Sequence, residues 1–132
     1  MPALPWTTIR RPPDPATGCT VLAARLPLRS HRDIPRFLWW TLRIRRRLAR
    51  TPGLVGYAFA ADVLGKTFWA VSAWTHRAEL GRFDRADPHR TAKGRLRAAM
   101  LPSTLVVWSC RADELPPPWE EARRRIAAAG AG

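Results

Sequence analysis

Four stretches of the chain alternate side chains with the two-residue period of a β-strand, and they lie at 19–29, 54–63, 67–74 and 104–110. Only Leu64-Gly65-Lys66 separates the second stretch from the third, which predicts a hairpin. Helical patterns separate the other stretches. The order β-α-β-β-α-β is the ferredoxin-like arrangement, so we expect an α+β fold with an antiparallel four-stranded sheet.

The helical regions carry start and stop signals. Ser30 is a plausible N-cap for the first helix, which Thr51-Pro52-Gly53 ends. The second helix is predicted to be split, because Thr75 caps one piece and Asp87-Pro88 starts another. An extra C-terminal helix is predicted over 119–129, with acidic residues early and arginines late, as the helix dipole favours.

Length and composition indicate one domain. The chain has 132 residues, 46% of them hydrophobic, which is enough for one buried core. Residues 1–18 hold five of the 13 prolines and are predicted to form an extended arm before a single domain at 19–132. No apolar run has the length of a transmembrane helix or a secretory signal, so we expect a cytoplasmic protein. Cys19 and Cys110 are too few for a zinc site and are expected to be buried.

The net charge of +13 favours anionic partners. On a helical wheel, the core stripe of the first helix (Phe37, Trp40, Thr41, Ile44 and Leu48) spans about 240° to 340° from Ile34. The opposite face gathers arginines around one tryptophan. It consists of Arg36, Trp39, Arg43, Arg46, Arg47 and Arg50.

This arginine face has two interpretations. It is either a solvated outer surface or a binding face for an acidic partner or an anionic membrane, and a Trp among arginines favours the second. Nucleic acid is disfavoured as the partner, because the chain has no helix-turn-helix, no zinc finger and no RNA-binding sheet signature.

His89 stands in the first turn of a predicted helix, where the helix dipole should lower its pKa and keep it neutral. A neutral imidazole could act as a base, a hydrogen-bond partner or a haem ligand, or simply pack locally. His31 and His76 are expected at the surface. The sequence shows no catalytic triad, carboxylate pair, phosphate loop or metal-spaced cluster, so no metal site is predicted.

Several segments resemble the dimeric α+β barrel superfamily, which includes antibiotic-biosynthesis-type, haem-degrading and spheroidene-monooxygenase-like proteins. The resemblance is carried by 68–74, by Phe83 and by Asp87-Pro88-His89-Arg90. Leu4-Pro5-Trp6 and the Leu115-Pro116…Trp119 segment are similar to a group of small actinobacterial proteins of unknown function.

The resemblance implies a homodimer whose sheets face each other, and a cavity between sheet and helices that binds a small hydrophobic or aromatic ligand. It further implies monooxygenase-like chemistry, with His89 as the acid, base or haem ligand and Arg90 orienting an anionic group. Haem-degrading members place their iron ligand where Lys93 stands, which argues against haem degradation. Cofactor-free members use an Asn, and this chain has none. The expected cavity wall is Trp40, Tyr57, Phe59, Phe68, Trp69, Trp74, Phe83, His89 and Trp108.

Overall fold

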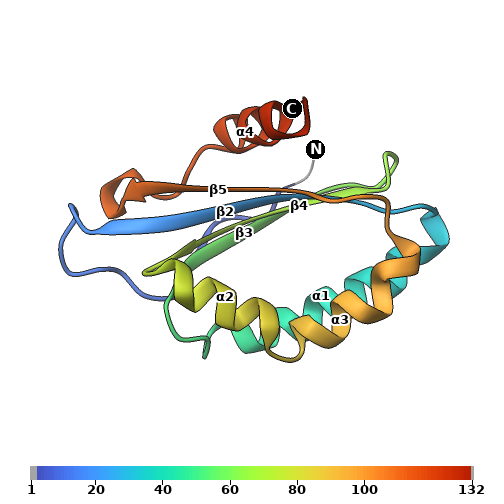
Figure 1. The fold of residues 1–132 in the computed structure, drawn as a ribbon, viewed down its shortest axis with the longest axis horizontal. Coiled ribbons are helices and arrows are strands. Elements are labelled where there is room, and N and C mark those ends of the chain that lie inside the picture. Colours follow the sequence, from blue (N-terminus) through green and yellow to red (C-terminus); the bar gives the residue numbers. More distant parts are fainter. Residues whose placement is uncertain (1–2, 132) are drawn as a thin grey trace.

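The computed structural model describes residues 3–131 and confirms the α+β class and the antiparallel sheet (Figure 1). The strands are β1 (Thr7–Thr8), β2 (Gly18–Pro27), β3 (Leu54–Asp62), β4 (Thr67–Trp74) and β5 (Thr104–Arg111). The helices are α1 (Ile34–Leu48), α2 (Arg77–Arg85), α3 (His89–Leu96) and α4 (Trp119–Ala131), with short 3-10 turns before α1, after α3 and after β5.

The sheet contains the four expected strands and one further strand. Its order is β1-β3-β4-β2-β5, and every neighbouring pair is antiparallel. The additional strand comes from the proline-rich segment, where Thr7 and Thr8 pair with Tyr57 and Gly56 at the edge of β3. The predicted hairpin joins β3 to β4, so the two most aromatic strands lie next to each other.

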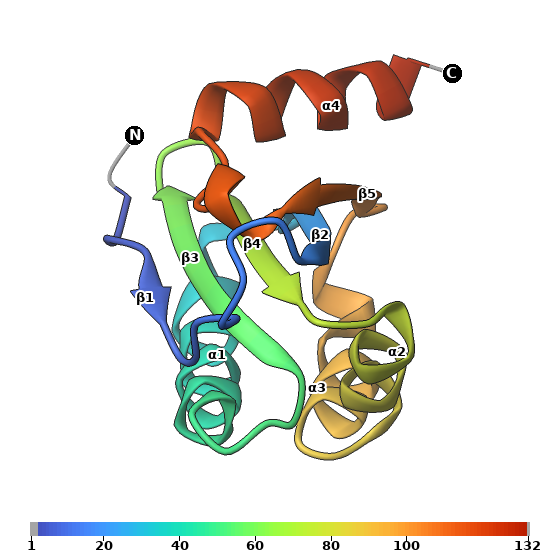
Figure 2. The same cartoon turned by 90° about the vertical axis from the view of Figure 1, so that its left-hand side faces the viewer.

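Helices cover both faces of the sheet. Helices α1, α2 and α3 lie below one face, and α4 lies alone across the other (Figures 1 and 2). The second helix is split as predicted, with α2 and α3 joined through Ala86, Asp87 and Pro88. The chain therefore has three layers, and the sheet has two separate interiors.

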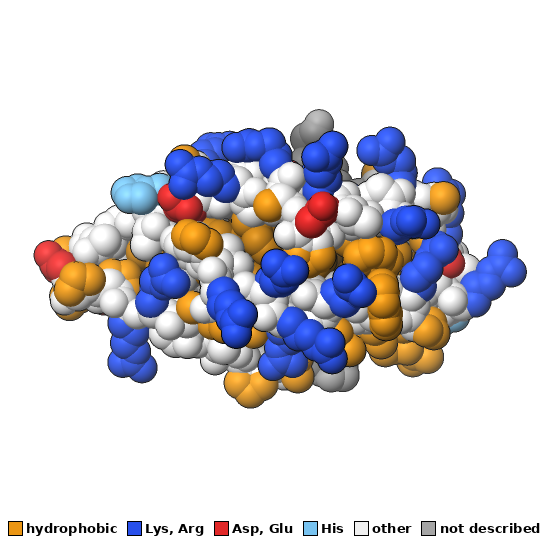
Figure 3. Space-filling model, turned by 90° about the horizontal axis from the view of Figure 1, so that it is seen from below, with side chains coloured by type: hydrophobic (Ala, Val, Ile, Leu, Met, Phe, Trp, Pro, Cys, Tyr) orange, Lys and Arg blue, Asp and Glu red, His pale blue; other side chains and the backbone are white. Residues whose placement is uncertain are grey.

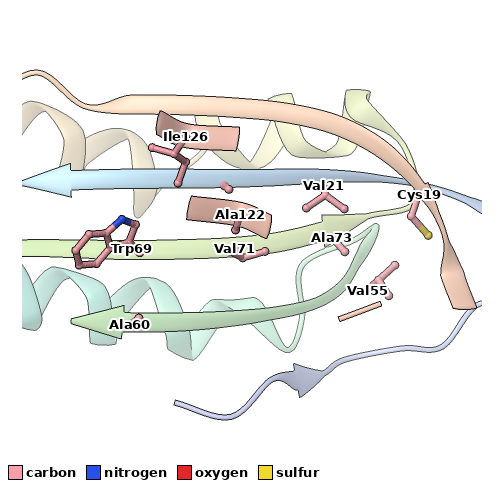
Figure 4. Close-up of a cluster of buried hydrophobic side chains, with 10 residues drawn as sticks. Cys19, Val21, Val55, Ala60, Trp69, Val71, Ala73, Ala122 and Ile126 are labelled. Atoms are coloured by element: carbon pink, nitrogen blue, oxygen red, sulfur yellow. The ribbon is translucent and has the colours of Figure 1, made fainter. Parts of the chain in front are cut away.

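The interior on the α4 side is one continuous cluster. Val21, Ala23 and Ala73 are completely buried there against Ala122 and Ile126 of α4 (Figure 4). Small and β-branched side chains dominate the strands here, so the helix can approach the sheet closely.

The interior on the other side is divided into two clusters. One joins Phe37 of α1 to Phe68 of β4, whose rings stack with centroids 4.5 Å apart. The other joins Leu48 of α1 to Leu54 and Trp74, with Phe83 of α2 packed against it. These clusters stand at opposite ends of β4, because Phe68 and Trp74 are six positions apart on the same face of that strand.

A β-bulge changes one expected strand face. The alternation places Val55 with Tyr57 and Phe59, but the register shifts between Leu54 and Gly56. The extra residue turns Val55 toward α4 and brings Leu54 to the side of Tyr57.

The two cysteines are direct partners across β2 and β5, and both are free. Cys19 is buried and Cys110 partly so. Burial, with a contribution from the neighbouring thiol, raises the pKa of Cys110 to about 11. Both side chains therefore stay protonated near neutral pH and pack as small apolar groups, as their sequence context indicates.

Candidate functional site

The centre of the sheet is open on the side of α1, α2 and α3. Ala70 and Ser72 lie in β4, the middle strand, and face these helices, yet both are partly exposed. Val71 and Ala73, which alternate with them and face α4, are 3% and 0% exposed. A central strand covered by helices exposes its side chains only where the helices stand away from it. We call this region, between the two aromatic clusters, the central cleft.

Neighbouring strands extend the floor of the central cleft. Leu22 of β2 pairs with Ser72, and Val107 of β5 pairs with Leu22, and both are partly exposed. Together with Ala70 and Ser72, they form a floor of small and aliphatic side chains. Such a floor leaves room for a flat apolar ligand.

Two polar contacts border this floor. The indole Nε1 of Trp74 donates a hydrogen bond of 2.8 Å to Ser72 Oγ. Tyr57, the register partner of Ser72 on β3, accepts a hydrogen bond of 3.3 Å from Arg45 Nε through its hydroxyl. The cleft therefore offers an indole-bound hydroxyl at its centre and a phenol held by a guanidinium beside it.

The Arg45–Tyr57 pair also lines a hollow at the β3 edge of the sheet, with a volume of about 220 Å³. Leu4, Pro5 and Thr7 close this hollow from the N-terminal segment. The aromatic rings of Tyr57 and Phe59 lie 5.4 Å apart here. An oxygen atom of an aromatic ligand could accept a hydrogen bond from Arg45 at this edge.

A series of contacting aromatic rings connects Trp74 to His89. Trp74 contacts Phe83 with ring centroids 5.4 Å apart, and Phe83 contacts His89 at 5.1 Å. His89 begins α3, and Phe83 lies near the end of α2, so the break between these helices sets this arrangement. His89 thereby contacts Phe83, which in turn packs against the cluster that contains Tyr57 and Trp74.

Asp84 fixes the orientation of the His89 ring. The imidazole Nδ1 lies 3.2 Å from Asp84 Oδ1 and 3.4 Å from its backbone carbonyl oxygen. Because both partners are acceptors, Nδ1 carries the hydrogen and Nε2 keeps its lone pair. Lys93 Nζ holds the other carboxylate oxygen of Asp84 at 2.8 Å.

The pKa of His89 lies below its ordinary value of 6.5, as the sequence predicts, but the principal cause differs. Burial of the imidazole is the largest contribution, and the nearby Asp84 carboxylate opposes it. The neutral ring with a free Nε2 lone pair is therefore the form present near neutral pH, which suits a general base.

This lowered pKa predicts a pH dependence of stability. Below pH 6.5 the unfolded chain protonates His89 while the folded chain does not, so the unfolded state binds more protons. The free energy of unfolding should therefore fall as the pH drops from 6.5 through the lower folded-state pKa. His89→Gln should remove this part of the slope in urea titrations, whereas His76→Gln, at an exposed position, should retain it. Equal slopes for both variants would contradict the burial of His89.

The structure separates the remaining predicted wall residues. Trp40 and Phe68 belong to the Phe37 cluster, at one end of the central cleft. Trp69 and Trp108 lie on the opposite face of the sheet, beneath α4, with the guanidinium of Arg123 over one and of Arg125 over the other. These two tryptophans therefore do not share a cavity with Trp74.

Arg90 also lies away from the aromatic cluster. It follows His89 on α3, and its side chain is exposed. Hydrogen bonds from Thr91 are the main reason that the pKa of Asp87 is lowered, and the charge of Arg90 adds a smaller contribution. The sequence did not single out Arg45 or Ser72, which the fold brings to the cleft. Arg45 stands about 20° from Ile34 on the helical wheel, at the border of the core stripe, and this position was the available signal.

The predicted arginine face of α1 is exposed along its length. Trp39 is 51% exposed and lies under the guanidinium of Arg43, 4.7 Å from the ring centroid. A groove of about 440 Å³ runs between α1 and α3. It is lined by Arg36, Trp39, Trp40, Thr91 and Arg95.

Within residues 3–131, no group of three or more His, Cys, Asp or Glu side chains is placed to hold a metal ion. In the same part of the chain, no helix combines the length and apolar character needed to cross a membrane.

Structural comparison finds the fold in known oxygenases. A protein from Nitrosomonas europaea, provisionally assigned as an antibiotic biosynthesis monooxygenase, matches with a TM-score of 0.64 and 15% identity, over 75% of this chain and 92% of its own. SnoaB, a cofactor-independent oxygenase from Streptomyces nogalater, matches with a TM-score of 0.58 and 17% identity, over 76% and 98%.

A conserved protein from Methanosarcina mazei matches equally well, with a TM-score of 0.63 and 9% identity, over 70% of this chain and 93% of its own. No sequence model of a protein family matches, and a search of curated proteins finds no relative. The chain thus has the ferredoxin-like α+β fold of the antibiotic biosynthesis monooxygenases, as the sequence resemblance implies.

Proposed function

We propose that the protein is a monooxygenase-like enzyme that oxidises a small aromatic or otherwise hydrophobic substrate in the central cleft. The observation that carries this proposal is the partly exposed Ser72 in the middle strand, between Tyr57 and Trp74. The fold shared with a cofactor-independent oxygenase supports the class of reaction.

The residues fit distinct roles in such a reaction. A flat substrate would lie on Ala70 and Ser72, with its oxygen substituent toward Arg45 and Tyr57. His89 Nε2 would remove a proton from the bound substrate, and Asp84 would stabilise the imidazolium that results. The substrate anion would then react with dioxygen, so that one CH2 group and one O2 give a carbonyl group and one water.

Haem is the cofactor that the resemblance leaves open, and the site fits it poorly. The neutral His89 could serve as an axial ligand. However, neither the hollow beside Arg45 nor the groove between α1 and α3 is lined by His89, so neither offers a porphyrin a place on this imidazole. We therefore assign no step to haem. Purified protein supplied with haemin should show no Soret shift that depends on His89.

Oxygen uptake with a panel of electron-rich phenols and anthrones tests the proposal. His89→Gln should lower kcat/KM by about 100-fold or more, the usual contribution of a general base, whereas His76→Gln should leave it unchanged. Ser72→Phe should abolish turnover by filling the floor of the cleft. Full activity of His89→Gln, or turnover that survives Ser72→Phe, would refute this assignment.

The homodimer implied by the resemblance also remains a proposal. Light scattering would test this proposal, and the expected mass in solution is that of two chains.

A further inference from the structure

The outer surface of α1 exposes large apolar side chains. Leu38, Trp39 and Leu42 are 43%, 51% and 53% exposed and lie within two turns of one helix. On the helical wheel they occupy a strip between about 40° and 140° from Ile34, away from the core stripe. Apolar side chains grouped in this way indicate a surface that another phase or molecule covers.

Positive charge surrounds this strip. Helix α1 carries five arginines and no acidic residue, and the neighbouring α3 carries three basic residues and none that is acidic. On the same wheel Arg45 borders the strip on one side, Arg43 borders it on the other, and Arg46 lies within it. Figure 3 shows this helical face of the molecule, where Lys and Arg side chains spread among hydrophobic ones and acidic side chains are sparse.

The combination selects among anionic partners. Nucleic acid would use the arginines but would gain little from Leu38 and Leu42, because phosphates and base edges offer leucine few contacts. An anionic bilayer contacts both the arginines and the apolar strip, because aliphatic and indole side chains enter the interface while guanidinium groups bind the headgroup phosphates. An exposed Trp beside leucines, as at Trp39, is typical of protein surfaces that lie at the headgroup level of a bilayer.

We propose that the outer face of α1 binds the surface of an anionic lipid bilayer. Leu38, Trp39 and Leu42 would enter the interface, and the surrounding arginines would bind headgroups. The groove between α1 and α3 would accept a phosphate between Arg36 and Arg95. This inference goes beyond the oxygenase proposal and does not rest on it, because Leu38, Trp39, Leu42, Arg43 and Arg46 lie on the exposed outer face of α1, away from the central cleft.

Sedimentation with vesicles tests the proposal on the full chain. Phosphatidylcholine vesicles containing phosphatidylglycerol should bind the protein, and vesicles of phosphatidylcholine alone should bind it at least about tenfold more weakly. Arg43→Glu with Arg46→Glu should weaken binding to the anionic vesicles by about tenfold or more. Leu38→Ser with Leu42→Ser should weaken it about fivefold or more without changing the net charge.

The matched control is Arg11→Glu with Arg124→Glu, which changes the net charge equally at exposed positions outside α1. It should retain at least half of the binding. An equal loss in this control, or full binding by the leucine variant, would overturn the proposal in favour of general charge attraction. Tighter binding to an oligonucleotide than to anionic vesicles, insensitive to the leucine variant, would overturn it in favour of nucleic acid.

Discussion

Replacing Trp74 with alanine should lower the free energy of unfolding by about 3–5 kcal/mol. The side chain is 1% exposed and packs among Leu48, Leu54 and Tyr57 in the cluster that joins α1 to the sheet. Its loss leaves a cavity there and removes the indole donor that satisfies Ser72. Urea unfolding followed by far-UV circular dichroism measures the change.

Trp39→Ala provides the matched control, because it removes the same indole from a position that is 51% exposed. Its cost should stay below about 1 kcal/mol. If the two variants unfold at the same urea concentration, the cluster of Leu48, Leu54, Tyr57 and Trp74 does not hold α1 on the sheet.

Gly53→Ala should destabilise the protein by about 2–3 kcal/mol. Gly53 precedes β3 with a φ of 81°, which an alanine adopts only with strain. An added Cβ would also stand 2.5 Å from Cβ of Glu79, so α2 would have to move. Since α2 carries Phe83 and Asp84, we expect the environment of His89 to change as well, which its NMR titration would show.

Gly94→Ala is the contrasting substitution. Gly94 lies inside α3, where an added Cβ would meet no atom within 4 Å. Alanine should therefore stabilise the protein by about 0.5–1 kcal/mol through its higher helix propensity. The two variants together separate the conformational requirement at residue 53 from a general effect of removing glycine. If Gly53→Ala leaves the free energy of unfolding unchanged, α2 can move away from residue 53 without cost.

Alternation and helical periodicity were sufficient to predict the framework. The faces of β2 and β4 agree with their alternation, because these two strands pair from Thr20 and Trp74 to Pro27 and Thr67 without a register shift. The wheel of α1 correctly separates Phe37 and Leu48 from the exposed arginines. The face predicted for Val55 was wrong, because a bulge depends on how β3 pairs with β4, which no local sequence pattern encodes.

The candidate site was less predictable, for a physical reason. Alternation places Trp69 and Trp74 on opposite faces of the sheet but does not say which face α1, α2 and α3 cover. The apolar residues of α4 predict that one face of this helix is buried. They do not predict that this face packs against the sheet above Trp69. Likewise, the Asp84 carboxylate beside His89 and the Arg45–Tyr57 hydrogen bond depend on the angles between helices and sheet, which only the assembled fold defines.

Helix α4 has a consequence for assembly. A barrel made from two sheets needs a bare surface on each, but here Ala122 and Ile126 already occupy that surface within one chain. Two copies can join sheet to sheet only if both helices lift away, which would expose Val21 and Ala73, or if the helices change places. After such an exchange each chain would keep the same interior while depending on the other's C-terminal segment to complete it.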